Sequence, residues 1–335
     1  MEQQSICRTS RNTTSYRTAG PQDGTLIIFI HGWPELSFMW HKQMDYFSNK
    51  GYYVVAPDMR GYGNSSVYNR YEDYCMEEIV KDMLQLLQCL NRPNAIWIGH
   101  DWGAPVVWSI ASHHPEVCRA IANLCVPYYP NGFAPENLIP LVNRDIYPLD
   151  SFPAGQWDYQ LYYTSHFEEG QKAFEADISR TFRAFMRSGN PAGEGKPGPT
   201  ATLQQLGGWF GGAGIAPDVP ADPAVLTTED LQEYINAFSK NGFFGPNAWY
   251  MNAERNIKYA QQSVNGGVLS LPVLFLHAAY DWICDTLHSK LADPMRTFCT
   301  NLREETVYSG HWMVQEKPDD VNRFLENWMQ QELGL

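Results

Sequence analysis

The sequence predicts an α/β protein: a mostly parallel, twisted sheet with helices on both faces and an inserted helical cap. Three observations predict this architecture. Continuous apolar runs such as residues 26–30 and 95–98 are typical of strands buried on both faces of a parallel sheet. Segments with helical periodicity alternate with these runs, as the right-handed crossovers of a parallel sheet require. The alternation stops after Pro127 and resumes at Pro272, which indicates an insertion between two parts of one sheet.

The elements of the sheet domain can be placed in order along the chain. Residues 1–24 are polar and turn-rich, which favours an edge hairpin or a loose arm. Buried strands are expected at residues 26–30, 52–56, 95–98, 120–126, 272–277 and 304–308. Helices are expected at residues 71–90, 104–114 and 318–330.

The inserted region is expected to form the cap. We therefore divide the chain into a sheet domain of residues 1–127 and 263–335 and a cap of residues 128–262. Residues 188–223 are dense in Gly and Pro and should be irregular, apart from a helical turn at 202–206. This segment fits either a mobile loop or a packed loop beside a pocket. Cap helices are expected at residues 167–186, 228–239 and 248–261.

Composition and charge limit the partners of the protein. Of the 335 residues, 44% are hydrophobic and 18% charged, enough apolar material for a large core. With 24 Lys and Arg against 37 Asp and Glu, the formal net charge is −13, and no basic run occurs. This charge argues against nucleic acid or an anionic membrane surface, and no apolar stretch reaches membrane-spanning length. The choice between a monomer and a homodimer stays open.

The cysteines indicate the redox setting. Their number is odd, no two are spaced as C-x-x-C, and the N-terminus has no signal-peptide pattern. We therefore expect neither a zinc site nor a disulfide framework, but reduced thiols in a cytoplasmic protein. The seven cysteines are Cys7, Cys75, Cys89, Cys118, Cys125, Cys284 and Cys299.

One stretch joins a predicted strand to a predicted helix through a sharp turn. Residues 95–98 run into Gly99-His-Asp-Trp-Gly103. Glycines on both sides of a polar residue allow the strand-to-helix turn that lifts this residue out of the sheet, most often a serine. Here the residue is Asp101. A carboxylate in this position points to attack on a carbon electrophile through a covalent alkyl ester, although aspartate also caps helices well.

Two further residues complete a pattern with Asp101. Asp101, Asp281 and His311 occur in this order, each just after a predicted strand. This is the order of nucleophile, acid and histidine in the alpha/beta-hydrolases. His31 also follows a strand, and ligands of parallel sheets bind outside the carboxyl ends of the strands. We therefore expect His31 and Asp101 to share one crevice.

With these residues the chain resembles the soluble epoxide hydrolases of the alpha/beta-hydrolase fold, along almost its whole length. The elbow motif is shared with haloalkane dehalogenases, so the substrate assignment depends on two tyrosines of the cap. The resemblance implies that Tyr159 and Tyr250 activate an epoxide oxygen, with Tyr162 and Tyr163 as alternatives for the first position. The matching residues are His31-Gly32-Trp33-Pro34, Gly99-His100-Asp101-Trp102-Gly103, Asp158-Tyr159-Gln160-Leu161-Tyr162, Trp249-Tyr250, Asp281 and Gly310-His311-Trp312.

The resemblance also implies a mechanism. Asp101 attacks an epoxide carbon, and water activated by His311, which Asp281 holds, hydrolyses the hydroxyalkyl ester to a vicinal diol. The backbone N–H groups of Trp33 and Trp102 are expected to form the oxyanion hole. No metal or organic cofactor is expected, and the substrates should be apolar or aromatic epoxides. Support for these motifs is expected from His31, Gly32, Pro34 and His100.

Two other functions fit the same residues. A haloalkane dehalogenase would use the same carboxylates and histidine with Trp102 as a halide donor. Such enzymes typically carry Asn where this chain has Trp33, which counts against this function. A catalytically silent receptor for hydrophobic ligands would keep the fold without turnover, but the complete set of expected catalytic groups argues against it.

Overall fold

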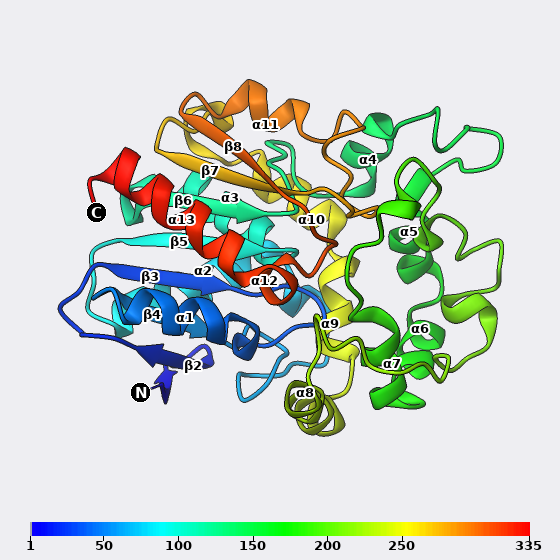
Figure 1. Cartoon of the computed structure of the whole chain (residues 1–335), viewed down its shortest axis with the longest axis horizontal. Helices are drawn as coiled ribbons and strands as arrows, with labels where there is room; N and C mark the ends of the chain where they lie inside the picture. Colours follow the sequence, from blue (N-terminus) through cyan, green and yellow to red (C-terminus); the bar gives the residue numbers. More distant parts are fainter. Residues whose placement is uncertain (1) are drawn as a thin grey trace.

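The computed structural model describes residues 2–335, which form one eight-stranded sheet flanked by helices (Figure 1). The strand order is β1-β2-β4-β3-β5-β6-β7-β8. Strands β3 to β8 pair in parallel, whereas β2 runs antiparallel to β4 and β1 antiparallel to β2. The strands are β1 Gln3–Arg8, β2 Thr13–Ala19, β3 Leu26–Ile30, β4 Tyr53–Pro57, β5 Ala95–His100, β6 Cys118–Leu124, β7 Val273–Ala278 and β8 Leu302–Val307.

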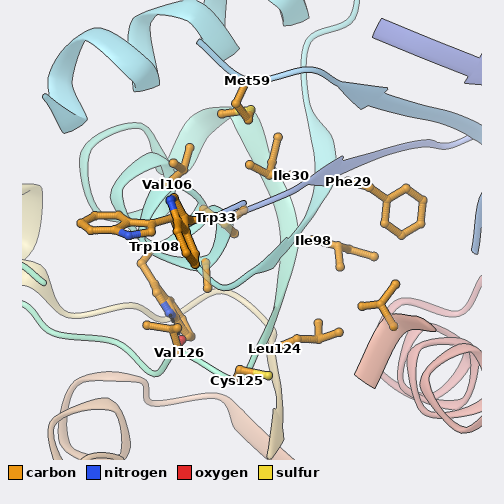
Figure 2. Packing of buried hydrophobic residues seen from close by; sticks show 14 of the residues in the cluster. Phe29, Ile30, Trp33, Met59, Ile98, Val106, Trp108, Leu124, Cys125 and Val126 are labelled. Atoms are coloured by element: carbon orange, nitrogen blue, oxygen red, sulfur yellow. Dashed lines mark hydrogen bonds between the residues drawn. The ribbon is translucent and has the colours of Figure 1, made fainter. Parts of the chain in front are cut away.

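The central strands are apolar because both of their faces are covered. Every residue of β3, β4, β5 and β7 is buried. In Figure 1, α1 and α13 cover one face of the sheet, and α2 and α3 cover the other. Figure 2 shows side chains of this core, among them Ile30 of β3, Ile98 of β5 and Val106 of α3. The sheet domain thus provides a rigid support for the loops at the strand ends.

The α-helices lie in two parts of the chain, the sheet domain and the region between β6 and β7. Those of the sheet domain are α1 His41–Ser48, α2 Met76–Cys89, α3 Gly103–His113, α11 Asp293–Phe298, α12 Met313–Glu316 and α13 Pro318–Leu333. Those between β6 and β7 are α4 Pro135–Leu138, α5 Asp158–Ser165, α6 Phe167–Glu175, α7 Ile178–Phe185, α8 Thr228–Asn241, α9 Phe244–Ala248 and α10 Ala253–Ala260. Short 3₁₀ turns join several of them, including Tyr71–Tyr74 and Trp249–Met251.

The region between β6 and β7 adds no strand to the sheet, and residues 125–272 are described throughout. Most of this region lies at one end of the sheet, while both chain termini lie toward the other end (Figure 1). This element order agrees with an inserted helical cap. The division of the chain at residues 127/128 and 262/263 stays a prediction.

The extent of two predicted cap helices is wrong. Residues 167–186 form two helices, because Asp177 caps α7 by accepting a hydrogen bond from the Arg180 N–H at 2.9 Å. Residues 248–261 are likewise split at Asn252, between a 3₁₀ turn and α10. The edge hairpin of residues 1–24 is confirmed by the β1–β2 pair.

The expectation of reduced thiols throughout is wrong for one pair. A disulfide joins Cys7 of β1 to Cys89 of α2. The two residues lie 82 positions apart, so their spacing carried no signal, and only the packing of β1 beside α2 brings them together. Within the described residues the other cysteines are free. No helix of residues 2–335 is both long and apolar enough to cross a membrane.

Candidate active site

The turn after β5 holds Asp101 in a conformation that few residues adopt. Asp101 has a φ of 51°, in the left-handed region. The two glycines beside it are required by close backbone contacts. A Cβ at Gly103 would lie 2.1 Å from the Ile30 carbonyl oxygen, and one at Gly99 would lie 2.5 Å from the Gly103 carbonyl oxygen. This packing lifts the Asp101 carboxylate above the strand ends, as the sequence predicts.

The loop after β3 brings a backbone donor to this carboxylate. The Trp33 N–H donates to Asp101 Oδ1 at 2.6 Å. A Cβ at Gly32 would come within 2.3 Å of Asp101 Oδ1 and 2.5 Å of the Trp102 nitrogen, so the loop could not approach the elbow with any other residue there. The predicted oxyanion pair, Trp33 and Trp102, therefore lies on the two segments that meet at Asp101.

His31 fixes the position of this loop. Its Nε2 accepts a hydrogen bond from the Met59 N–H at 2.9 Å, so its Nδ1 carries the proton that is donated to the Gly32 carbonyl at 2.9 Å. Burial lowers the pKa of His31 to about 4, which keeps the ring neutral. His31 thus ties the loop to the end of β4, and Pro34 follows through a cis peptide bond.

The predicted triad residues come together at the strand ends. His311 Nδ1 donates to Asp281 Oδ2 at 2.7 Å, and His311 Nε2 lies 3.4 Å from Asp101 Oδ2. The other Asp281 oxygen accepts from the N–H groups of Ile283 and Cys284 at 3.0 and 3.1 Å. Burial opposes the charge of His311, but Asp281 and then Asp101 outweigh it and hold the pKa of His311 well above its usual value. The surroundings of His311 therefore favour its protonated form.

Two further side chains hold the backbone of His311. His100 Nε2 lies 2.7 Å from the His311 carbonyl oxygen, and Cys125 Sγ lies 3.4 Å from the same oxygen. The side-chain ligand atoms of His100, Cys125 and His311 come within 4.8 Å of one another. Two of them are directed at one carbonyl group, so the cluster is accounted for as hydrogen bonding around the His311 turn. The expected support from His100 agrees with this contact.

A cavity of about 550 Å³ lies against these groups, and Asp101, Asp281 and His311 all line it. Tyr159 and Tyr250 line the same cavity, with their ring centroids 5.6 Å apart. Burial raises the pKa of both phenols well above the usual value, and the nearby Asp101 carboxylate adds to the effect. Both hydroxyls are therefore neutral groups that can donate a hydrogen bond into the cavity.

The two alternative tyrosines have other surroundings. The described residues that line the cavity do not include Tyr162 or Tyr163. Tyr162 stacks on His166 with the ring centroids 4.8 Å apart. Tyr163 stacks on Tyr250 at 4.4 Å, behind the cavity wall. The geometry therefore favours Tyr159 over both.

Parts of the Gly- and Pro-rich segment 188–223 pack beside the cavity, while many of its other residues are exposed. The N–H groups of Gly189 and Gly310 both donate to the Glu316 carboxylate, at 3.0 and 2.9 Å, which joins the segment to the His311 loop. Trp209 lines the cavity and packs in an aromatic cluster with ring-centroid distances of 5.1–6.5 Å. The other rings of this cluster are Trp33, Tyr159, Tyr163, Phe174, Phe185 and Phe210.

Sequence reasoning missed a buried carboxyl group next to the site. Glu35 accepts hydrogen bonds from Tyr234 Oη of α8 and, at 2.6 Å, from Gln315 Nε2 of α12. Burial raises the pKa of Glu35 to about 7, although these two donors lower it in part. Glu35 directly follows the His-Gly-Trp-Pro motif, and this position was the only signal in the sequence.

Known proteins resemble the chain in sequence and in structure. Residues 25–318 match the model of the alpha/beta hydrolase fold family. The chain is 33% identical over 311 residues to bifunctional epoxide hydrolase 2 of Sus scrofa, covering 92% of this chain and 52% of that protein. It is 30% identical over 328 residues to epoxide hydrolase A of Mycobacterium tuberculosis, covering 92% and 91%. The crystal structure of epoxide hydrolase A from Mycobacterium thermoresistibile superposes with a TM-score of 0.81 at 27% identity, over 98% of both chains.

These matches define the class first: the chain belongs to the alpha/beta hydrolase fold family. Within this family, its sequence relatives and its fold group it with the epoxide hydrolases. The chain spans about half the length of the mammalian relatives it matches and nine-tenths of the mycobacterial one.

Proposed function

We propose that this protein hydrolyses apolar or aromatic epoxides to vicinal diols through an ester on Asp101. The observation that carries the proposal is the arrangement around one cavity. Asp101 lies between the Trp33 amide and His311, and Asp101, His311, Tyr159 and Tyr250 all line this cavity. A nucleophile, a base and two acids therefore surround one space.

The two oxygens of Asp101 have different roles in the first step. Oδ1 is already bound by the Trp33 N–H, so Oδ2 is the atom that attacks an epoxide carbon. The ring C–O bond breaks, and the epoxide oxygen accepts hydrogen bonds and then a proton from the tyrosine pair. An alkoxide is far more basic than the phenolate of an ordinary phenol, whose pKa is about 10, so proton transfer to the epoxide oxygen is favourable. The raised pKa of the two buried phenols makes this driving force smaller. Oδ1 remains as the carbonyl oxygen of the ester.

The second step needs His311 as a base. Alkylation removes the negative charge of Asp101, which is one of the groups that hold a proton on His311. The pKa of His311 therefore falls when the ester forms, and its proton is released through solvent as the phenolate left by ring opening regains one. The neutral ring can then take a proton from water. The water oxygen attacks Asp101 Cγ, and the charge that develops on Oδ1 meets the Trp33 N–H. The bond between Cγ and Oδ2 then breaks, and His311 passes the proton taken from water to the leaving oxygen. The diol leaves, and Asp101 is restored as a carboxylate with one oxygen from water.

The path of oxygen tests this mechanism. One turnover of styrene oxide with excess enzyme in ¹⁸O water should place the label in the peptide that contains Asp101. The diol should carry label only in later turnovers, because its first new oxygen comes from Asp101. Label in the diol of the first turnover would refute the ester mechanism.

A halide substrate separates the closest alternative. The Trp102 ring lies edge-on to Tyr250, with the ring centroids 5.1 Å apart. We expect turnover of styrene oxide and none of 1-chlorobutane. The reverse result would favour a dehalogenase, and binding without turnover of either would favour a receptor.

A further inference from the structure

The indole of Trp33 makes a contact that the oxyanion role does not require. Its backbone N–H serves Asp101, while its side chain extends into the cap region. There the Trp33 Nε1–H donates to Asn247 Oδ1 at 3.0 Å, and both side chains are buried. This hydrogen bond joins the loop after β3 to α9.

Asn247 stands three residues before Tyr250, on a continuous stretch formed by α9 and the 3₁₀ turn Trp249–Met251. Residues three apart lie on the same side of such a stretch. The hydroxyl of Tyr163 lies 3.5 Å from the same Asn247 oxygen, and the Tyr163 ring stacks on Tyr250 at 4.4 Å. Asn247 therefore contacts the loop that carries the oxyanion donor and the ring that supports Tyr250.

We propose that Trp33 and Asn247 are positioning residues that couple the oxyanion loop to the epoxide-activating Tyr250 through the hydrogen bond from Trp33 Nε1 to Asn247 Oδ1. The inference rests on the function proposed above. In this proposal the bond sets the distance between the Asp101 carboxylate, which attacks the epoxide carbon, and the Tyr250 phenol, which binds the epoxide oxygen. Misplacing such groups by about 1 Å can cost up to about 10² in rate, so one well-placed bond between them has a measurable effect.

Packing alone does not explain a tryptophan at this position. The Trp33 ring packs near four aromatic rings, and a phenylalanine could pack against the same four: Phe174, Phe185, Trp209 and Tyr250. Only the indole has an N–H group to donate. The substitution Trp33→Phe therefore removes the donor while it retains an aromatic ring and the backbone amide.

A double-mutant cycle tests the coupling. The rate of ester formation on Asp101 is measured by rapid quench with styrene oxide and mass analysis, for Asn247→Leu in the wild-type and Tyr250→Phe backgrounds. We expect a loss of about tenfold in the wild type and less than about twofold in Tyr250→Phe, because the bond acts through the Tyr250 hydroxyl. A purely structural role would give the same loss in both backgrounds and would overturn the proposal.

Two further variants keep the outcome decisive. Trp33→Phe should slow ester formation about as much as Asn247→Leu does. The variant that combines the two substitutions should be no slower than the slower single variant, because both remove the same hydrogen bond. Additive losses would contradict the coupling. Trp108→Phe is the matched control, since it removes a buried indole N–H that donates to Val126 at 3.0 Å, away from the cavity. It should lower the melting temperature and leave ester formation unchanged. If the wild type forms no ester at all, the proposed function itself fails, and this inference with it.

Discussion

The strand ends and the cap contribute to one cavity by different physical means. At the strand ends, the position of each polar group is set by backbone contacts: Gly99, Gly103 and Gly32 allow approaches that a Cβ would block. In the cap, positions are set by aromatic packing, with Trp209 at the centre of a cluster of rings. The first kind of support leaves little freedom, whereas the second can be repacked.

This difference suggests a division of labour. The strand ends should determine whether any epoxide reacts, since they hold the proposed nucleophile and the proposed base. The cap should determine which epoxide reacts and how fast its ring opens, since it provides the phenols and most of the apolar wall. Substitutions at the strand ends should therefore affect all substrates alike, and substitutions in the cap should not.

The largest effect is expected for Asp101→Asn. The amide has the same shape but cannot act as a nucleophile, so turnover of every epoxide should fall by at least about 10³-fold. The fold should persist, as judged by an unchanged melting temperature. Diol production near the wild-type rate would disprove the role of Asp101 and the division between the two regions.

His311→Gln should separate the two chemical steps. Without a base the ester is not hydrolysed, so steady-state turnover should fall by about 10³-fold or more while one equivalent of substrate still reacts. Mass analysis of the Asp101 peptide after mixing should show the added mass of the epoxide. A variant that neither turns over nor becomes alkylated would place His311 in the first step as well.

The sequence was most informative where local rules are strict. A buried strand that runs into glycines around one polar residue fixes the elbow, and three strand ends in the order Asp101, Asp281, His311 fix the triad. The structure brings these residues together as expected. Such positions depend on contacts within a few residues or on strand order, and both can be inferred from a pattern.

The sequence was least informative where distant segments meet. Asn247 is 214 residues from its partner Trp33, and Cys7 is 82 residues from Cys89. The two partners of Glu35 lie 199 and 280 residues away. No periodicity or spacing encodes such partners, because they follow from how the cap and the edge hairpin pack. The break between α6 and α7 at Asp177 lies between these two cases. Asp177 is a residue type that caps helices, but the apolar periodicity around it favoured one long helix over residues 167–186.

Removal of the phenols tests the role of the cap in ring opening. Tyr159→Phe and Tyr250→Phe should each slow ester formation by roughly 10- to 100-fold, and the double variant by about 10³-fold, because the leaving oxygen then lacks its acids. Hydrolysis of a preformed ester should change little. Tyr162→Phe, outside the cavity, serves as the control. Equal losses in both steps would mean that the tyrosines shape the site as a whole.

A change in the aromatic wall should alter selectivity and spare the chemistry. Trp209→Ala enlarges the cavity, so the ratio of kcat/KM for trans-stilbene oxide over styrene oxide should rise by about tenfold. Trp209→Phe should give a smaller change in the same direction. If both variants lost activity toward both substrates equally, Trp209 would belong with the strand ends in function, and the comparison between the regions would not hold.

Glu35 lies where the strand ends meet the cap, and its titration should make the folding stability depend slightly on pH. The pKa of Glu35 is about 7 in the folded protein against an ordinary 4.5, because the carboxyl group is buried between the loop after β3, α8 and α12. Between these values the folded protein keeps the proton while the unfolded chain loses it, so folding stability falls as the pH rises from about 4.5 to about 7. Glu35→Gln removes this titration. Its stability relative to the wild type should therefore rise between pH 5 and pH 8, by roughly 3 kcal/mol at most.

Thermal unfolding of both proteins at several pH values measures this difference. Glu326→Gln is a suitable control, since hydrogen bonds from Lys50 and Tyr46 hold the pKa of Glu326 below its usual value. The stability that Glu326 contributes is present above its unfolded pKa and is lost only as the pH falls below it, so this variant should differ from the wild type by a constant amount over pH 5–8. A constant difference for Glu35→Gln as well would mean that Glu35 is ionised throughout this range. The contact between the strand ends and α8 would then be an ionic one, held by Tyr234 and Gln315 as donors to a full negative charge.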